Sequence, residues 1–128
     1  MSNQTKDRIL IVDDDSEFRR SLRKILQKAG YHVSSAASAL QASEILAKHA
    51  YPLILLDLHM PGKSGFELLS EVKEKSPESK VIMMTVDGAV GNYTKAMNDG
   101  AFAYLNKPIK MKKILAYTNM ALNNILIS

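Results

Sequence analysis

The 128 residues suit a single domain, and their 46% hydrophobic and 23% charged content is typical of a globular chain that buries a core. No apolar run approaches the roughly 18 residues of a membrane span, and the polar start MSNQTKDR lacks the apolar segment of a signal peptide. The absence of cysteine excludes disulfides and thiolate zinc sites, so a reducing cytoplasm is the compartment that fits most easily.

The net charge of +4 is unevenly distributed along the chain. No acidic residue follows Asp99, and a predicted early helix is rich in basic residues. The two basic groups are Lys107, Lys110, Lys112 and Lys113, and Arg19, Arg20, Arg23, Lys24 and Lys28. They are either solvated helix faces or surfaces for an acidic partner. Direct binding to nucleic acid is not predicted, because no basic motif interleaved with aromatic residues accompanies them.

Short apolar runs alternate with segments of helical periodicity. The runs predict five strands, of which the second has the weakest pattern, at Ile9–Val12, His32–Ala36, Leu53–Leu56, Val81–Met84 and Ala103–Leu105. After the first strand, apolar residues spaced as one helix face extend from Phe18 to Ala29. Gly30 is well placed to end that helix.

The next two helices begin with a capping-box pattern, a serine followed three residues later by glutamine or glutamate. The second helix begins at Ser38 with Gln41, and the third at Ser64 with Glu67. Their predicted buried residues are Leu40, Ile45 and Leu46 in the second helix, and Phe66, Leu69 and Val72 in the third.

The last two helices differ in expected stability. The fourth, at Val90–Asn98, contains Gly91 and Asn92, which are poor helix formers, so it should be the least stable. The fifth extends from Met111 to Ile125, with a periodic set made up of Ile114, Leu115, Thr118 and Leu122.

Strand–helix alternation repeated five times predicts a parallel sheet covered by helices on both faces. Right-handed crossovers make this a doubly wound, flavodoxin-like α/β fold, for which 2-1-3-4-5 is one of two common strand orders. We expect one domain over residues 1–128, with a flexible N-terminus at 1–7. Ligands of such folds bind beyond the carboxyl ends of the strands, so the residues there are the candidates for function.

Carboxylates, a hydroxyl and an ammonium follow the strands at that edge. Asp13, Asp14 and Asp15 follow the first strand, Asp57 the third, Thr85 the fourth and Lys107 the fifth. Taken singly, each can be a helix cap, a turn residue or a surface charge. Two carboxylates roughly 4 Å apart repel by about 4 kcal/mol at an effective dielectric of 20, and Mg²⁺, which binds carboxylate oxygens, would offset this repulsion. Asp15 is expected to point to solvent or to cap the following helix.

Metal binding alone leaves Thr85 and Lys107 without a role, whereas phosphoryl transfer uses the whole set. Asp57 can attack phosphorus as a carboxylate nucleophile. Mg²⁺ and Lys107 can neutralise charge on the phosphoryl oxygens, and the Thr85 hydroxyl can hydrogen-bond one of them. The product is an aspartyl phosphate.

Four motifs resemble a bacterial two-component response-regulator receiver domain, in the order and at the spacing of that family. They are ILIVDDD, LILLDLHMPGKSGFELL, VIMMT and GAFAYLNKPI. The resemblance implies a cytoplasmic phosphoacceptor that takes its phosphoryl group from the phosphohistidine of a sensor histidine kinase or phosphotransfer protein. Such a domain is regulated by phosphorylation and is not an enzyme in the usual sense, although it catalyses its own phosphotransfer and dephosphorylation.

The resemblance assigns a role to each site residue. Asp57 is the implied phosphoacceptor, and Lys107 is implied to contact the phosphoryl group, with a cis peptide bond to Pro108. The implied Mg²⁺ ligands are Asp14 and Asp57 directly, Asp13 mainly through water, and the backbone carbonyl of His59.

The resemblance also implies a conformational switch and a tuned phosphoryl lifetime. On phosphorylation Thr85 moves toward a phosphoryl oxygen and Tyr104 turns inward; the alternative for Tyr104 is an ordinary core tyrosine. Val86 stands where the family usually has a small residue, and we expect it to narrow access to the acceptor. His59 either orients the attacking water or is an exposed loop residue. Asp87 either tunes hydrolysis or caps the fourth helix, and the cap is favoured.

Partners follow from the same resemblance. The kinase is expected to dock on the basic first helix, and a second copy on the face made by the fourth helix, fifth strand and fifth helix. No direct contact with a membrane is expected. The segments NDGAFAYLNKPI and TVDGAV resemble receivers of nitrogen-regulation transcription activators, which favours the regulatory part of a longer protein over a stand-alone receiver.

The sequence also bears on three alternative functions: an aspartyl phosphatase, a flavin-binding module and an interaction module. A dehalogenase-type aspartyl phosphatase has its nucleophile on the first strand and a second aspartate two residues later, whereas Asp57 follows the third strand and precedes His59 by two. A flavin-binding module needs a hydroxyl-rich loop after the first strand, where three aspartates would repel a phosphate. No residue argues for or against a receiver that serves only as an interaction module.

Overall fold

The structure, a computed structural model, describes residues 8–86 and 89–123 of the chain. Strands and helices alternate in the predicted order. The strands are β1 (Arg8–Val12), β2 (His32–Ala36), β3 (Leu53–Asp57), β4 (Lys80–Thr85) and β5 (Ala103–Asn106). The helices are α1 (Ser16–Lys28), α2 (Ala39–Leu46), α3 (Gly65–Lys75), α4 (Val90–Asn98) and α5 (Met111–Leu122). The segment 1–7 and the predicted end of the last helix at Ile125 lie outside the described residues.

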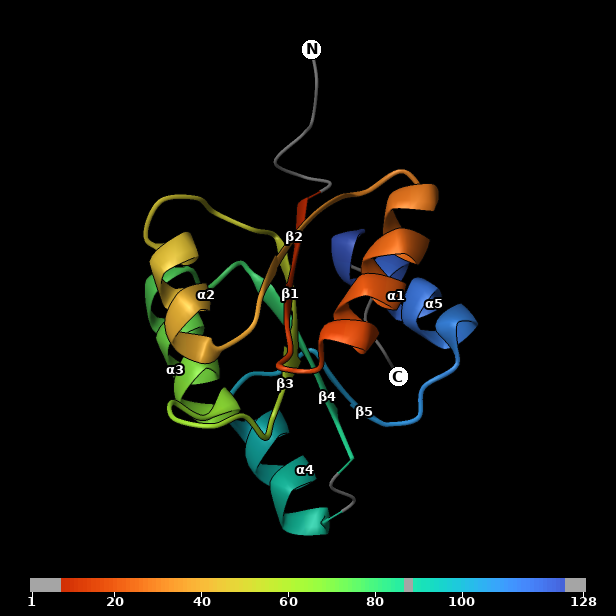
Figure 1. The fold of residues 1–128 in the computed structure, drawn as a ribbon. Helices are drawn as coiled ribbons and strands as arrows, with labels where there is room; N and C mark the ends of the chain where they lie inside the picture. The colour runs from red at the N-terminus through yellow and green to blue at the C-terminus, as the bar shows by residue number, and fades with distance from the viewer. Residues whose placement is uncertain (1–7, 87–88, 124–128) are drawn as a thin grey trace.

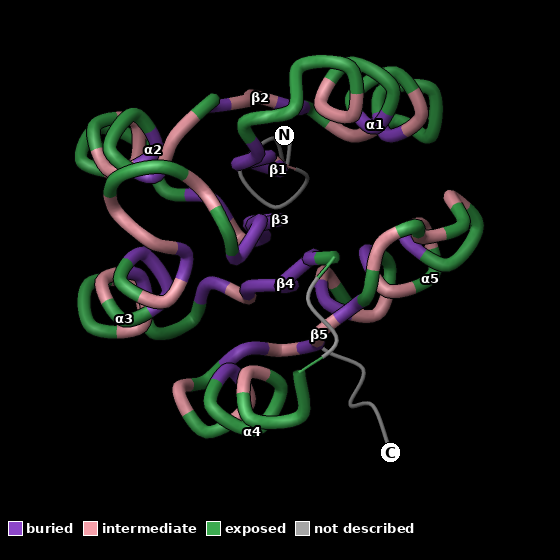
Figure 2. Tube along the Cα trace, turned by 60° about the horizontal axis from the view of Figure 1, so that its bottom comes forward, coloured by how far each residue is buried: buried purple, intermediate pink, exposed green. Residues whose placement is uncertain are grey.

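The five strands form one parallel sheet in the order β2-β1-β3-β4-β5, which confirms the predicted doubly wound fold. Helices α1 and α5 cover one face of the sheet, and α2, α3 and α4 cover the other (Figures 1 and 2). The strand order reverses between β1 and β3, so the crevice at their carboxyl ends is the expected ligand position. Within the described ranges, no helix is long and apolar enough to cross a membrane.

Alternate strand residues supply two cores, one on each face of the sheet. In β1, Ile9 and Ile11 pack in the core beneath α1 and α5, whereas Leu10 and Val12 pack beneath the other three helices. Every residue of β3 is buried, as expected for a parallel strand covered on both faces. The aspartate that ends β3 is therefore held by the most enclosed strand of the sheet.

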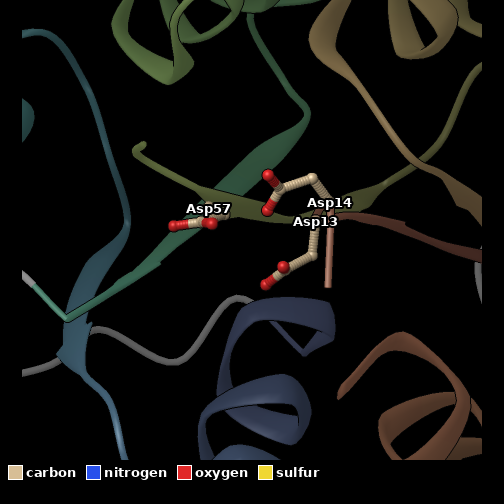
Figure 3. Close-up of side chains that lie close together, drawn as sticks. All are labelled: Asp13, Asp14 and Asp57. Atoms are coloured by element: carbon tan, nitrogen blue, oxygen red, sulfur yellow. The ribbon is translucent and has the colours of Figure 1, made fainter. Parts of the chain in front are cut away.

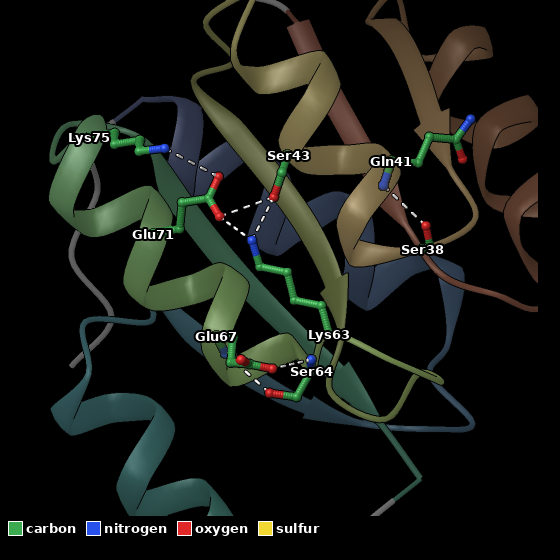
Figure 4. Close-up of polar contacts among 8 residues, drawn as sticks. All are labelled: Ser38, Gln41, Ser43, Lys63, Ser64, Glu67, Glu71 and Lys75. Carbon is green, nitrogen blue, oxygen red and sulfur yellow. Dashed lines mark hydrogen bonds and ion pairs between the residues drawn. The ribbon is translucent and has the colours of Figure 1, made fainter.

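Side-chain caps fix where three of the helices begin. The Asp15 carboxylate accepts hydrogen bonds from the backbone N–H groups of Glu17 and Phe18 at the start of α1, so of its two predicted roles the structure shows the helix cap. The capping box of α3 is complete, with Ser64 as its first residue (Figure 4). At α2 only half of the box forms, because the Gln41 side chain accepts from the Ala37 N–H instead of from Ser38.

The prediction that Leu40 is buried is wrong, since its side chain is 63% exposed. The two small residues Ala39 and Ala42 form the buried face of α2 instead, and they let the helix approach the sheet closely. Leu40 follows Ala39 by about 100° of helix rotation and so points away from the sheet. Ala29, predicted on the buried face of α1, is exposed at the C-cap of that helix.

Helix α4 has little to hold it to the sheet. Its N-cap residue is Ala89, which offers no side-chain acceptor, and Ala96 is its one fully buried residue among those described. Asp87, the favoured cap in the sequence prediction, lies outside the described residues. The small buried area agrees with the prediction that this helix is the least stable.

Candidate functional site

Three carboxylates converge at the carboxyl ends of β1 and β3. Asp13, Asp14 and Asp57 each offer an oxygen within 4.8 Å of the others (Figure 3). Asp13 and Asp57 are buried and Asp14 is exposed, so the cluster opens to solvent on one side. The sequence prediction that the aspartates after the first and third strands meet at one crevice is confirmed.

Asp13 is fully buried and is held from three directions. Its carboxylate accepts hydrogen bonds from the Asp15 backbone N–H at 2.9 Å and from Lys107 Nζ at 2.6 Å. Its backbone carbonyl accepts a hydrogen bond from Arg19 Nη1 at 2.7 Å. These contacts hold the turn that follows β1. Asp14 belongs to this turn, so its position is fixed as well.

Lys107 connects the two buried carboxylates. Its Nζ lies 2.6 Å from Asp13 Oδ2 and 3.9 Å from Asp57 Oδ2, and its side chain is only 15% exposed. The Lys107 backbone N–H donates to the Thr85 carbonyl at 2.7 Å, and the bond from Lys107 to Pro108 is cis, as expected. The ends of β1, β3, β4 and β5 are thereby joined at one point.

The environment of Asp57 disfavours its negative charge. Burial raises the pKa of Asp57, and the neighbouring Asp13 carboxylate raises it further, followed by Asp14. The Lys107 ammonium and the His59 N–H, which donates to Asp57 Oδ1 at 3.3 Å, lower the pKa of Asp57. They offset only part of the increase, so the pKa stays above its ordinary value. A site with three carboxylates and one nearby ammonium has spare negative charge, which suits a hard divalent cation with oxygen ligands.

The loop after Asp57 is fastened to two helices. Lys63 donates to Ser43 Oγ of α2 at 2.8 Å and forms an ion pair with Glu71 of α3 (Figure 4). The Ser43 hydroxyl also donates to Glu71 at 3.0 Å, so the three side chains contact one another. This network holds the loop that carries His59.

The other predicted site residues lie around this cluster. Thr85 ends β4 and is fully buried, whereas Val86 after it is 75% exposed. Tyr104 of β5 is partly buried and meets Tyr93 of α4 edge to face, with ring centroids 5.6 Å apart. The exposed His59 side chain is compatible with both of its predicted roles.

Sequence reasoning missed two residues near the site, Gly65 and Phe18. Gly65 donates its N–H to the Leu58 carbonyl at 3.1 Å, and a Cβ on Gly65 would lie 2.7 Å from the Asp57 carbonyl oxygen and 2.8 Å from Leu58 Cα. A glycine directly after a serine cap was the available signal. Phe18 packs its ring against Lys107, a contact between residues distant in sequence.

We expect Gly65→Ala to destabilise the fold by about 1–3 kcal/mol, because the methyl group meets backbone atoms that cannot turn aside. Urea unfolding measures this change. Gly91→Ala in α4 is the matched control, since a Cβ there meets nothing within 4 Å and alanine favours a helix. Equal stability of Gly65→Ala and the wild type would contradict the close packing at this position.

The sheet order, the acidic crevice and the lysine after β5 together define a receiver domain. The profile of the response regulator receiver domain matches residues 9–119, and the chain belongs to this family. Receivers of this family are the phosphoacceptor signalling domains of two-component systems and are regulated by phosphorylation.

Named relatives come from plants, bacteria and an archaeon. The two-component response regulator ARR11 of Arabidopsis thaliana is 38% identical over 109 residues, which are 84% of this chain and 21% of that protein. The alginate biosynthesis transcriptional regulatory protein AlgB of Pseudomonas aeruginosa is 36% identical over 107 residues, 84% of this chain and 24% of AlgB. The chain thus spans about a fifth to a quarter of the length of these curated relatives.

Solved receivers share the fold along nearly the whole chain. A CheY-like receiver domain protein from Methanospirillum hungatei JF-1 has a TM-score of 0.90 and 34% identity, covering 93% of this chain and 95% of that one. The beryllofluoride-activated NtrC4 receiver domain dimer has a TM-score of 0.88 and 34% identity, covering 93% and 98%. The predicted fold and family are both confirmed.

Proposed function

We propose that Asp57 of this receiver accepts a phosphoryl group from a phosphohistidine of a sensor kinase or phosphotransfer protein in the cytoplasm. The observation that carries this proposal is the position of Asp57: a buried carboxylate, destabilised as an anion, faces both an acidic cluster and the Lys107 ammonium. A carboxylate with a raised pKa is more basic and therefore a stronger nucleophile, and the Lys107 ammonium and a bound cation can offset the negative charge that the phosphoryl group brings.

The proposed metal is Mg²⁺, held directly by the Asp14 and Asp57 carboxylates and the His59 backbone carbonyl, and by Asp13 mainly through water. The convergence of three carboxylate oxygens supports this set, because Mg²⁺ binds few carboxylates and keeps waters. When bound, Mg²⁺ neutralises charge on the acidic cluster and the phosphoryl oxygens. Asp14 is the exposed member, so a cation enters from its side.

In the proposed transfer, an Asp57 carboxylate oxygen forms the bond to phosphorus while the bond from phosphorus to the imidazole nitrogen of the donor breaks. The His59 N–H, already on Asp57 Oδ1, orients the carboxylate. The Lys107 ammonium, 3.9 Å from Asp57 Oδ2, is close enough to reach an oxygen of the incoming group. Hydrolysis later returns the phosphoryl group to water, so one site catalyses both steps.

The proposed switch couples this chemistry to α4 and β5. The Thr85 hydroxyl binds a phosphoryl oxygen, and Tyr104 turns toward the space that Thr85 leaves. The edge-to-face contact of Tyr104 with Tyr93 supports this coupling, because inward rotation of Tyr104 changes its contact with α4. Helix α4, in which Ala96 is the one fully buried residue among those described, is the element most easily moved.

Incubation with acetyl phosphate, followed by intact mass measurement, tests the proposal. We expect one added phosphoryl group with Mg²⁺ and none after chelation. Where hydrolysis is too fast for an adduct to accumulate, binding of beryllofluoride, a stable phosphoryl mimic, replaces the mass measurement. A receiver that binds neither acts only as an interaction module.

We predict that Val86→Ala is phosphorylated faster by acetyl phosphate, by about two- to tenfold, because the branched side chain stands directly after Thr85 at the mouth of the site. Stopped-flow kinetics measures the rate at saturating Mg²⁺. The control is Val90→Ala, which removes an equally exposed valine from α4. Equal rates for wild type and Val86→Ala would show that residue 86 does not limit access.

We propose that the kinase docks on the basic face of α1. Arg20 and Lys24 are exposed and supply that face, whereas Arg19 is partly buried and bonds the Asp13 carbonyl. Charge reversal at Arg19 therefore disturbs the site itself, and Arg20 is the better residue for testing docking. The relatives that contain a receiver within a longer regulator support the proposal that this domain regulates an attached output.

A second copy of the chain is the proposed partner of the α4–β5–α5 face in the phosphorylated state. A groove beside this face is lined by two lysines, Lys73 and Lys80, and by large aromatic and apolar side chains, namely Tyr93, Met97, Phe102, Tyr104 and Tyr117. The similar NtrC4 receiver forms a dimer when activated by beryllofluoride, which supports the same association here.

A further inference from the structure

The Lys107 ammonium has a third neighbour besides the two carboxylates. The ring of Phe18 lies with its centroid 4.2 Å from Lys107 Nζ, well inside the range of a cation–π interaction. The same nitrogen is 2.6 Å from Asp13 Oδ2 and 3.9 Å from Asp57 Oδ2. The ammonium is therefore enclosed by two carboxylates and one aromatic face, with 15% of the side chain exposed.

Local structure places Phe18 at this point. It is the third residue of α1, and its N–H donates to the Asp15 carboxylate at 3.1 Å, so its backbone is tied to the acidic turn. Its ring packs at the edge of the core beneath α1 and α5. The cap and the core together hold the ring in one position beside Lys107.

An aromatic face acts on an ammonium differently from a polar residue. It attracts the positive charge but presents no hydrogen-bond acceptor, so it does not compete for the N–H donors. A lysine side chain has four flexible carbons. Fixing its ammonium in one position when a ligand binds costs conformational entropy and so weakens binding. The ring thus restrains the Lys107 ammonium before a ligand binds. The N–H groups of the ammonium stay available to oxygens on the Asp57 side.

We propose that Phe18 is a positioning residue for phosphoryl transfer: its ring face holds the Lys107 ammonium beside Asp57 and keeps water from that side. The inference rests on the proposed function, because it assigns Phe18 an effect on the group that receives the phosphoryl oxygens. Phe18 touches neither substrate nor metal and acts through Lys107.

The test compares beryllofluoride affinity, at saturating Mg²⁺, among the wild type and three variants. Phe18→Leu keeps an apolar side chain but removes the aromatic face, whereas Phe18→Tyr keeps the face. Tyr31→Leu is the matched control, since Tyr31 packs against the same core but precedes β2, at the edge of the sheet opposite the site. Mg²⁺ affinity without beryllofluoride reports whether the acidic cluster stays intact.

We expect Phe18→Leu to lower beryllofluoride affinity about three- to tenfold, with Phe18→Tyr and Tyr31→Leu within about twofold of the wild type. Mg²⁺ affinity should not fall in Phe18→Leu. The proposal is overturned if Phe18→Leu binds as the wild type does, if Tyr31→Leu loses as much, if Phe18→Tyr fails to retain affinity, or if Mg²⁺ binding falls in parallel. Failure of the wild type to bind beryllofluoride would instead reject the proposed function.

Discussion

Lys107→Met is expected to lower the free energy of unfolding by about 2–4 kcal/mol when no divalent cation is bound. The substitution removes the ammonium 2.6 Å from Asp13, a carboxylate with no exposed surface, and the one cation near Asp57 among the described contacts. Two buried carboxylates then face each other with only backbone N–H donors to stabilise them. Breaking a buried pair on one side is costly because the remaining charge stays desolvated.

Urea unfolding with and without Mg²⁺ measures this effect. Lys112→Met is the matched control, because Lys112 is exposed on α5 and its loss should change stability by no more than about 0.5 kcal/mol. Saturating Mg²⁺ should recover part of the loss in Lys107→Met, since the cation replaces some of the missing positive charge. A Lys107→Met variant as stable as Lys112→Met would contradict the role given to this ion pair.

Asp57→Asn is expected to abolish Mg²⁺-dependent phosphorylation and, without Mg²⁺, to make the resting domain more stable than the wild type at pH 7. The amide removes the nucleophile and also removes a charge that the fold disfavours, since burial and Asp13 raise the pKa of Asp57. Mg²⁺ should raise the melting temperature of the wild type more than that of the variant. The control is Asp15→Asn, which makes the same change at an exposed cap where asparagine serves equally well.

The raised pKa of Asp57 also fixes the sign of a pH effect. In the unfolded chain this carboxyl loses its proton near pH 4, whereas in the folded domain it does so at a higher pH. Between these two values the folded state binds more protons, so stability falls as the pH rises through that window. Without Mg²⁺, the free energy of unfolding should fall less between pH 4 and 7 in Asp57→Asn than in the wild type. A variant less stable than the wild type at pH 7 would contradict this account.

Hydrophobic periodicity and the residues that begin or end helices were enough to predict the order of the strands and helices. Five short apolar runs predicted the strands, and Ser38 and Ser64 predicted helix starts correctly because caps act within a few residues of the chain. Leu40 was misplaced because residue size alone does not say which helix face meets the sheet, and the small pair Ala39 and Ala42 meets it instead.

The part of the candidate site that lies directly after the strands could be predicted from the sequence. In a parallel sheet the carboxyl ends share one edge, so the convergence of Asp13, Asp14 and Asp57 follows from topology. The packing of Phe18 on Lys107 was not predictable, because it depends on how side chains from separate elements meet in space. The glycine after the Ser64 cap indicated a special position at Gly65, but not that the Leu58 backbone lies against it.

The position of the phosphoryl group is the most direct test of the central claim. Phosphorylation with acetyl phosphate and Mg²⁺, reduction by borohydride and tryptic peptide mass spectrometry would locate the modified aspartate. The peptide from His49 to Lys63 contains Asp57 as its only aspartate, whereas Asp13, Asp14 and Asp15 fall together in another peptide. Reduction confined to the His49–Lys63 peptide is the predicted result. Reduction in the peptide with the three aspartates, or anywhere outside His49–Lys63, would contradict Asp57 as the phosphoacceptor.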